Sequence, residues 1–202
     1  MVDRSQSQPD LTVVALTAKS FSNWLLYGMT EDIHKEVTAM FAYQASHGSM
    51  PLRKVAKTNL DVMRRTPREE LARDWSAAFA LGMSSVTPHE SVIRCGLTMQ
   101  EPRDLTLAWM RRYGVLPDES LAEPADHLGL QLALLGLLCV QHLDATARPV
   151  CSTDDISRYV DERLAWLPDL RAHMKALDAP AGVIGLVDFL VEFLDDAFIR
   201  HR

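Results

Sequence analysis

The uncharged run from Leu128 to Val140 constrains the fold of this chain more than any other stretch, because nearly all of it is leucine or another apolar residue. Leucine favours a helix, and a helix that is apolar all round belongs in a protein interior. The run is too short to cross a bilayer, which takes about 20 residues. It therefore predicts a central buried helix whose apolar part is 128–143 and whose first turn opens near Pro124.

The composition fits one helical domain built around that helix. The chain has 202 residues, a length typical of a single domain, and 48% of them are hydrophobic, which is enough to form a core. Aromatic residues make up only 7%, while leucine and alanine are plentiful, and this balance favours helices over strands. We expect an all-α fold, with residues 1–10 as a flexible leader and residues 11–202 as one compact domain.

Apolar residues recur at helical spacing along the chain, and prolines, glycines and capping residues divide the pattern into segments. Thr30 before two acids, and Ser152 before Thr153-Asp154-Asp155, are typical helix N-caps. The stretch 83–95, which contains Pro88, predicts a loop. About nine helices are expected, over 11–29, 31–45, 51–65, 67–81, 102–113, 124–143, 153–164, 168–179 and 181–199.

Charge and cysteine usage exclude several classes of protein. The net charge is −6 and no long basic run occurs, which argues against a nucleic-acid binder. Three cysteines without regular spacing do not describe a disulfide framework. The N-terminal residues are polar and lack the charged-then-apolar form of an export signal, so we expect a cytoplasmic protein without a transmembrane segment.

A carboxylate beside an imidazole, Asp126-His127, stands just before the apolar run and is the first candidate for a functional surface. Gln131 follows His127 by four residues, so the two share one helix face and form a polar stripe on an apolar helix. Buried polar groups require partners. The stripe is therefore either a recognition point for a polar or cationic chain, or a core histidine held by Gln131 or by the backbone.

Common catalytic and metal-binding patterns are missing from the sequence. Adjacent helical residues point about 100° apart, so Asp126 cannot readily orient His127 as the acid of a catalytic triad does. The chain contains no GxSxG nucleophile motif, no P-loop, no GxGxxG and no HExxH pair. We expect no catalytic residues, no metal ligands and no bound cofactor.

Two further groups have an ordinary structural interpretation beside a functional one. Glu90-Ser91 follows Pro88 and could cap a chain segment, although loops held on a rigid scaffold often bind ligands. Trp75 and Phe79 lie at helical spacing, which is more typical of a core than of a binding site.

Taken in order, these segments resemble the TorD/DmsD family, the cytoplasmic chaperones of molybdenum-containing redox enzymes. The resemblance is strongest over residues 70–140, and the flanks agree only in length and helical pattern. No single motif is specific, but their order and spacing are. The segments that carry the resemblance are Trp75-Ser76-Ala77-Ala78-Phe79-Ala80-Leu81-Gly82, Pro88-His89-Glu90-Ser91-Val92 and Glu123-Pro124-Ala125-Asp126-His127.

The resemblance implies a helical binding protein without enzymatic activity. Its partners would be the twin-arginine signal peptide and the apo form of a molybdopterin-containing oxidoreductase, which the chaperone holds until the cofactor is inserted. Carboxylates suit such a peptide, because arginine pairs with them through two parallel hydrogen bonds. By resemblance, the peptide-binding residues are Trp75, Phe79, Glu90, Ser91, Pro124, Asp126, His127 and Gln131.

One position departs from the family pattern. Many relatives have glutamate four residues after the histidine, where this chain has Gln131, and the missing charge leaves the identity of the client open. A small helical hydrolase or an adaptor protein using Asp126 and His127 is the alternative. The chain is expected to be a monomer or a dimer formed by exchange of a segment.

Overall fold

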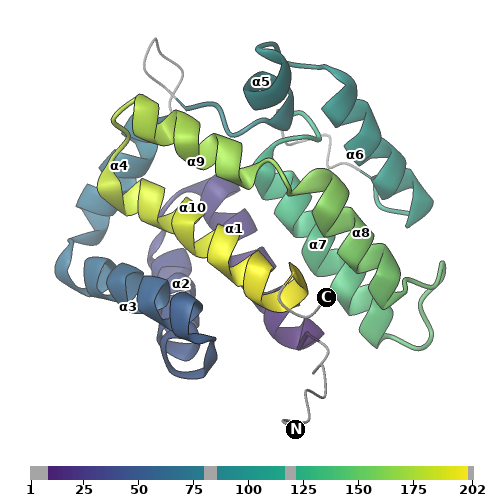
Figure 1. Cartoon of the computed structure of the whole chain (residues 1–202), viewed down its shortest axis with the longest axis horizontal. Helices are drawn as coiled ribbons and strands as arrows, with labels where there is room; N and C mark the ends of the chain where they lie inside the picture. The colour runs from purple at the N-terminus through teal and green to yellow at the C-terminus, as the bar shows by residue number, and fades with distance from the viewer. Residues whose placement is uncertain (1–8, 80–85, 117–121, 200–202) are drawn as a thin grey trace, which may run out of the picture.

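The computed structural model describes residues 9–79, 86–116 and 122–199, and every element in these ranges is helical. Figure 1 shows the helices packed around one core. The only β-type pairing in the described residues is an isolated bridge between His89 and His127. The helices are α1 (Leu11–Tyr27), α2 (Glu31–His47), α3 (Met50–Arg65), α4 (Arg68–Phe79), α5 (Glu90–Cys95), α6 (Glu101–Arg112), α7 (Leu128–Leu143), α8 (Thr153–Arg163), α9 (Leu167–Ala176), α10 (Ala181–Leu194) and the π-helix η1 (Asp195–Ile199).

The all-α prediction is confirmed, and so is the central position of the apolar helix. α7 packs along α1 more extensively than any other two helices pack on each other. Leu134, Leu135 and Leu138 of α7 are at most 1% exposed. The two helices are in close contact at Gly136, where a Cβ atom would lie 3.4 Å from the carbonyl oxygen of Ala15 in α1. None of the described helices is long and apolar enough to span a membrane.

Aromatic rings join the helices on the other side of α1. Phe21 of α1 stacks on Phe189 of α10 at 5.4 Å between ring centroids. Phe41 of α2 meets the edge of the same Phe189 ring at 4.9 Å. These rings are at most 1% exposed. Burial of aromatic side chains in such pairs contributes strongly to stability, so α1, α2 and α10 form one unit with α7.

Local capping signals fixed several helix starts as expected. The Thr30 side chain accepts from the Ile33 N–H at 3.3 Å, and Ser152 forms a reciprocal capping box with Asp155. Gly114 follows α6 with a positive φ of 68°, a conformation that glycine adopts without strain.

Two boundaries were predicted wrongly. Part of the predicted loop 83–95 is helix α5, which has only six residues, too few to give a periodic apolar pattern. The central helix does not open at Pro124, because His127 is its N-cap and α7 begins at Leu128. The predicted end of α4 near Leu81-Gly82 and most of the predicted leader 1–10 lie outside the described residues.

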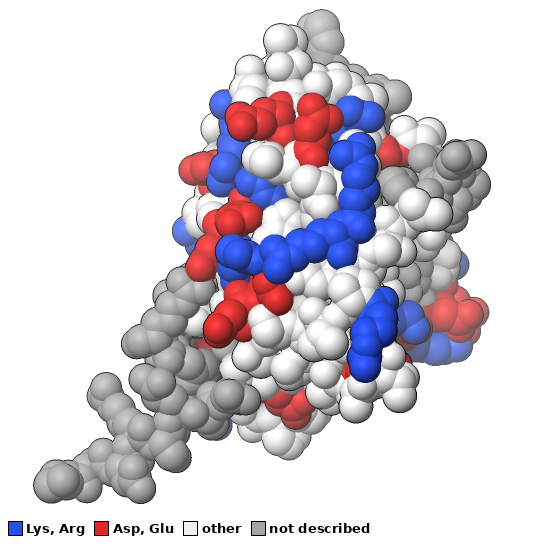
Figure 2. Space-filling model, turned by 90° about the vertical axis from the view of Figure 1, so that its right-hand side faces the viewer, with Lys and Arg blue, Asp and Glu red and all other residues white. Residues whose placement is uncertain are grey.

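Charges of both signs share the face formed by α6, α7 and α8. Figure 2 shows Lys and Arg side chains in an arc on this face, bordered by acidic ones. Asp155 of α8 forms ion pairs with Arg112 at 2.9 Å and with Arg158 at 2.7 Å. The mixture does not provide the uniformly basic field that a nucleic-acid backbone attracts.

Candidate functional site

The segment before α5 crosses the N-terminus of α7 and fixes the candidate site. The Leu128 N–H donates to the Pro88 carbonyl oxygen at 2.8 Å, and the Glu90 N–H donates to the Asp126 carbonyl oxygen at 3.1 Å. Sequence segments 88–92 and 123–128 are thereby paired backbone to backbone. The two motifs that suggested a site are therefore neighbours in the fold.

Asp126 points inward from this pairing and is fully buried. Its Oδ2 accepts from the Ser91 N–H at 2.8 Å, which satisfies a free N–H in the first turn of α5. Ser91 in turn accepts at Oγ from the Gln100 N–H at 3.2 Å. Asp126 Oδ1 is buried and has no hydrogen-bond partner among the described residues. One acceptor of this carboxylate is thus unsatisfied, and it lies in the protein interior.

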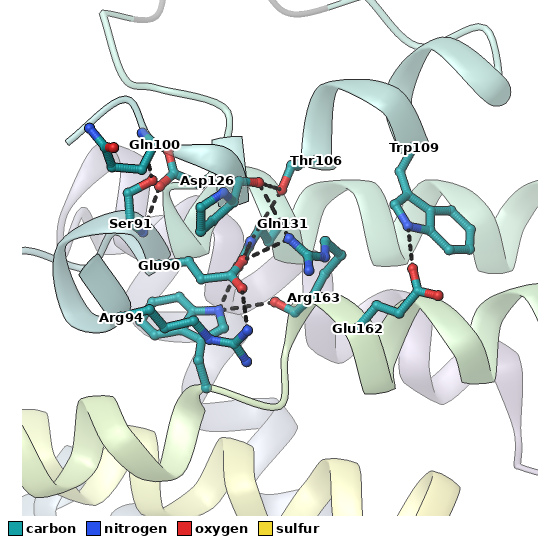
Figure 3. Close-up of polar contacts among 12 residues, drawn as sticks. Glu90, Ser91, Arg94, Gln100, Thr106, Trp109, Asp126, Gln131, Glu162 and Arg163 are labelled. Atoms are coloured by element: carbon teal, nitrogen blue, oxygen red, sulfur yellow. Dashed lines mark hydrogen bonds and ion pairs between the residues drawn. The ribbon is translucent and has the colours of Figure 1, made fainter. Parts of the chain in front are cut away.

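Glu90 belongs to a buried charged network between α5, α7 and α8 (Figure 3). Its side chain is 0% exposed, and Arg163 Nη1 lies 3.4 Å from its Oε2. Arg94, one turn further along α5, approaches Oε1 to 3.3 Å. Burial raises the pKa of the Glu90 carboxyl, while the nearby Arg163 guanidinium opposes that shift. The network links three helices through one carboxylate.

Gln131 is the neutral member of the same network. Its Nε2 donates to Glu90 Oε2 at 2.7 Å and to Thr106 Oγ1 at 3.3 Å. Its Oε1 accepts from Trp166 Nε1 at 2.9 Å. The side chain is 0% exposed, so glutamine here supplies donors as well as an acceptor inside the core. A glutamate at this position would place a second buried carboxylate beside Glu90.

A second group lies at the edge of the site, where solvent reaches it. His89 Nε2 lies 3.0 Å from Glu123 Oε2, and the Glu123 side chain is 44% exposed. The His89 and His127 rings meet edge to face at 4.9 Å between centroids. Glu123 is therefore an accessible carboxylate held beside the buried Asp126 of the same turn.

Ligand atoms of His89, Glu123 and His127 lie within 4.8 Å of one another, which raises the question of a metal ion. The hydrogen bonds argue against one. His127 Nδ1 accepts from the Gly129 N–H at 3.0 Å, so a neutral ring carries its proton on Nε2 and has no second free lone pair. Metal-bound histidines usually donate their other ring N–H to an acceptor, whereas His89 Nδ1 has no partner in the described chain.

His127 caps α7 and stays neutral. Burial, reinforced by the neighbouring His89, lowers the pKa of the His127 imidazole to about 3. The ring is 4% exposed and its acceptor Nδ1 faces the free N–H groups of the helix N-terminus, a position that disfavours a cation. At physiological pH, His127 can offer a hydrogen bond from Nε2 but no charge.

This shift in pKa predicts that acid destabilises the protein through His127. Between pH 6.5 and about 3 the unfolded chain binds a proton that the folded chain does not, so stability falls as pH falls through that range. The loss is about 2 kcal/mol at pH 5 relative to pH 8. Denaturant unfolding at both pH values should show the loss in the wild type. It should be absent in His127→Asn, which can still cap the helix but does not titrate.

The matched control for that experiment is His47→Asn on the exposed end of α2. This variant should keep the full acid dependence of the wild type. If His127→Asn loses stability between pH 8 and pH 5 as steeply as His47→Asn does, the buried His127 imidazole is not the group responsible.

Trp75 and Phe79 lie apart from this group, on α4. Their rings contact each other at 5.5 Å between centroids. Trp75 lines a surface hollow of about 440 Å³ with Tyr27, Arg68 and neighbouring residues, and no other predicted site residue lines it. The C-terminal end of α1 connects the two places. Tyr27 lines the hollow, while a Cβ atom at Gly129 would meet the preceding Leu26 at 2.8 Å.

Of the eight predicted residues, six thus lie around the N-terminus of α7 and two lie beyond the end of α1. Pro124 is half-buried in the turn before Asp126. Three further residues lie in this region around the N-terminus of α7 and were not predicted as site residues: His89, Glu123 and Arg163. The first two stand inside the motifs that were singled out, but Arg163 carries no local signal because its contact with Glu90 spans 73 positions.

Comparison with known proteins gives a consistent result. The family model described as nitrate reductase delta subunit matches residues 48–172. "Chaperone protein TorD" of Photobacterium profundum is 30% identical over 138 residues, which is 64% of this chain and 64% of that protein. The proteins of the same name from two Vibrio vulnificus strains are 28% and 34% identical over 138 residues, in each case 65% of this chain and 64% of the relative.

Proposed function

The chain belongs to the nitrate reductase delta subunit family, to which the TorD chaperones are related, and on that premise we propose that it is a maturation chaperone for a molybdopterin-containing oxidoreductase. It binds the twin-arginine signal peptide of that enzyme and holds the apo form in the cytoplasm until the cofactor is inserted. The match to Chaperone protein TorD of Photobacterium profundum spans only 64% of that protein's length. The match to the family model, residues 48–172, includes both motifs at the N-terminus of α7.

The observation that carries this proposal is the pair of carboxylates at the turn before α7. Glu123 is 44% exposed and Asp126 Oδ1 has no partner among the described residues. An incoming arginine would find an accessible carboxylate at Glu123, three residues before the buried Asp126 carboxylate, which has one unsatisfied acceptor. Arginine forms paired hydrogen bonds with carboxylates, and each charge-assisted bond is stronger than a neutral one.

The same geometry does not favour the hydrolase alternative. Asp126 bonds to the Ser91 N–H and His127 Nδ1 accepts from the Gly129 N–H, so the carboxylate does not orient the imidazole. A general base needs a free acceptor atom within reach of the proton it removes. Because the neutral His127 ring uses its acceptor atom in capping, binding is supported better than catalysis.

Glu123→Gln is expected to weaken binding of a twin-arginine leader peptide by about tenfold, because an accessible charged partner of arginine contributes about 1.5 kcal/mol. Isothermal titration calorimetry with a synthetic leader peptide measures the change. Asp126→Ala combined with His127→Ala should weaken binding further and should also impair maturation of the client enzyme.

Asp61→Asn is the control, because Asp61 is an exposed acid on α3, far along the chain from the site. It should bind the leader peptide as the wild type does. The proposal fails if no leader peptide from the same organism binds, or if Glu123→Gln and Asp61→Asn bind equally well.

A further inference from the structure

An apolar groove is lined by residues of α1 and α2, and none of its described lining residues belongs to the carboxylate turn 123–127. Its volume is about 420 Å³, within the range of roughly 300–1,000 Å³ that ligand sites occupy. Leu16, 60% exposed, and Tyr43, 44% exposed, stand at its rim. The groove is lined by Val13, Leu16 and Ser20 of α1 and by Met40, Tyr43 and Gln44 of α2.

Gln44 in the wall of this groove has an unused hydrogen-bond donor. The residue is 3% exposed, and its amide Nε2 is buried with no partner among the described residues. An unsatisfied buried donor costs about 1–3 kcal/mol. A ligand that brings an acceptor oxygen into the groove would remove this cost.

The charges at the groove suit an uncharged ligand. Among the described residues that line it, Lys19 and Glu36 are charged, one of each sign. Neither a cationic nor an anionic chain is therefore favoured over a neutral one. An apolar polypeptide segment fits all three requirements: apolar side chains for the walls, no net charge, and a backbone carbonyl oxygen for Gln44 Nε2.

The groove and the Trp75 hollow are both lined by residues of α1 and lie a short distance apart along it. From Ser20 in the groove to Tyr27 at the Trp75 hollow is seven positions along α1, or about 10 Å of helix. On α2, Glu36 lines the groove and Glu31 lines the hollow, and these two residues are five positions apart. A peptide of a few extended residues can span that interval at about 3.3 Å per residue.

We propose that the α1–α2 groove binds the apolar segment of the client's leader, with a backbone carbonyl oxygen of that segment accepting a hydrogen bond from Gln44 Nε2. The inference rests on the proposed function, since it takes the arginines of the same peptide to be held at Glu123. The groove is a separate surface, so the peptide is recognised at two places joined by the C-terminal end of α1.

Calorimetry with two synthetic peptides tests the groove. Both carry an Arg-Arg pair; in one it is followed by a run of leucine and alanine, in the other by serine and glycine. The wild type should bind the apolar peptide more tightly. Leu16→Glu should weaken that peptide about tenfold, the equivalent of losing the burial of one leucine, and leave the polar peptide unchanged. Leu105→Glu, at a leucine of α6 that is 40% exposed, should bind both peptides like the wild type.

Gln44→Leu gives an independent readout. It should weaken the apolar peptide about threefold to tenfold, by loss of one hydrogen bond. It should also raise the melting temperature of the free protein, because a buried unsatisfied donor is replaced by a side chain of similar size. A residue with a purely structural role would not show weaker binding together with higher stability.

The possible failures are distinguishable. If Glu123→Gln weakens the binding of both peptides while Leu16→Glu and Gln44→Leu bind them as Leu105→Glu does, the groove is not a peptide site and the proposed function stands. If the apolar peptide binds equally with or without its arginines and Leu16→Glu abolishes binding, the groove stands and the proposed function fails. If sedimentation shows that Leu16→Glu turns a dimer into monomers, the groove is an interface between copies and the proposal is overturned.

Discussion

Leu134→Asp is expected to abolish the cooperative unfolding transition, because it places a carboxylate in the centre of the core. Leu134 is 1% exposed on the face of the helix that packs in the interior. Burying an unpaired polar group costs about 2–7 kcal/mol and a charge costs more, in addition to about 2 kcal/mol of lost leucine burial. The sum reaches the total stability of a typical domain, about 5–15 kcal/mol.

The same helix supplies the control. Leu137, three positions further along α7, is 45% exposed. Leu137→Asp loses little burial, and its cost from helix propensity and an acid in the later half of the helix is about 1 kcal/mol. Circular dichroism should show a sharp melting transition for Leu137→Asp and none for Leu134→Asp. A Leu134→Asp protein that melts like its control would show that α7 is not the centre of the core.

The features that could be predicted from the sequence depend only on residues that are close together along the chain. The apolar run identified α7 because a helix without charges has only one stable place in a folded domain. Thr30 and Ser152 marked their helix starts because an N-cap bonds to a residue two or three positions away. Such signals need no knowledge of the tertiary structure.

The features that could not be predicted depend on distant partners. Gln131 was expected to share a polar stripe with His127, but its side chain turns to Glu90 and Trp166, which are 41 and 35 positions away. No local sequence pattern predicts contacts between residues so far apart along the chain. The family resemblance placed Glu90 and Asp126 in one region of the molecule, but it did not indicate that both carboxylates are fully buried.

That burial makes the network around Glu90 the second sensitive point of the fold. Arg163→Met should destabilise the protein by about 3–5 kcal/mol, because it leaves a buried carboxylate without its most deeply buried cation. Methionine keeps the length of the aliphatic stem, so the loss reports the charge. By contrast, Lys35→Met removes an exposed ion pair with Glu31 and should leave the denaturation midpoint nearly unchanged.

A double mutant separates loss of the ion pair from loss of packing. Glu90→Gln with Arg163→Met removes both charges and keeps a side chain that can bond to Gln131, so it should be more stable than Arg163→Met alone. If the double mutant is no more stable than Arg163→Met, the unpaired Glu90 charge does not cause the loss, and the packing of Arg163 accounts for it.

The dependence on pH gives a second way to identify the carboxylate. Burial raises the pKa of Glu90 and Arg163 opposes the shift, so removing Arg163 raises that pKa further. A carboxyl whose pKa is raised by folding favours the folded state when protonated, and this contribution is lost as pH rises. The difference in free energy of unfolding between wild type and Arg163→Met should therefore narrow as pH falls from 7 toward 4.5.

The control pair is Glu90→Gln and the double mutant. Because Glu90→Gln cannot titrate at this position, the difference in free energy of unfolding between these two variants should not narrow in that way. A gap for Arg163→Met that stays constant with pH would mean that Glu90 is not the charge that Arg163 balances.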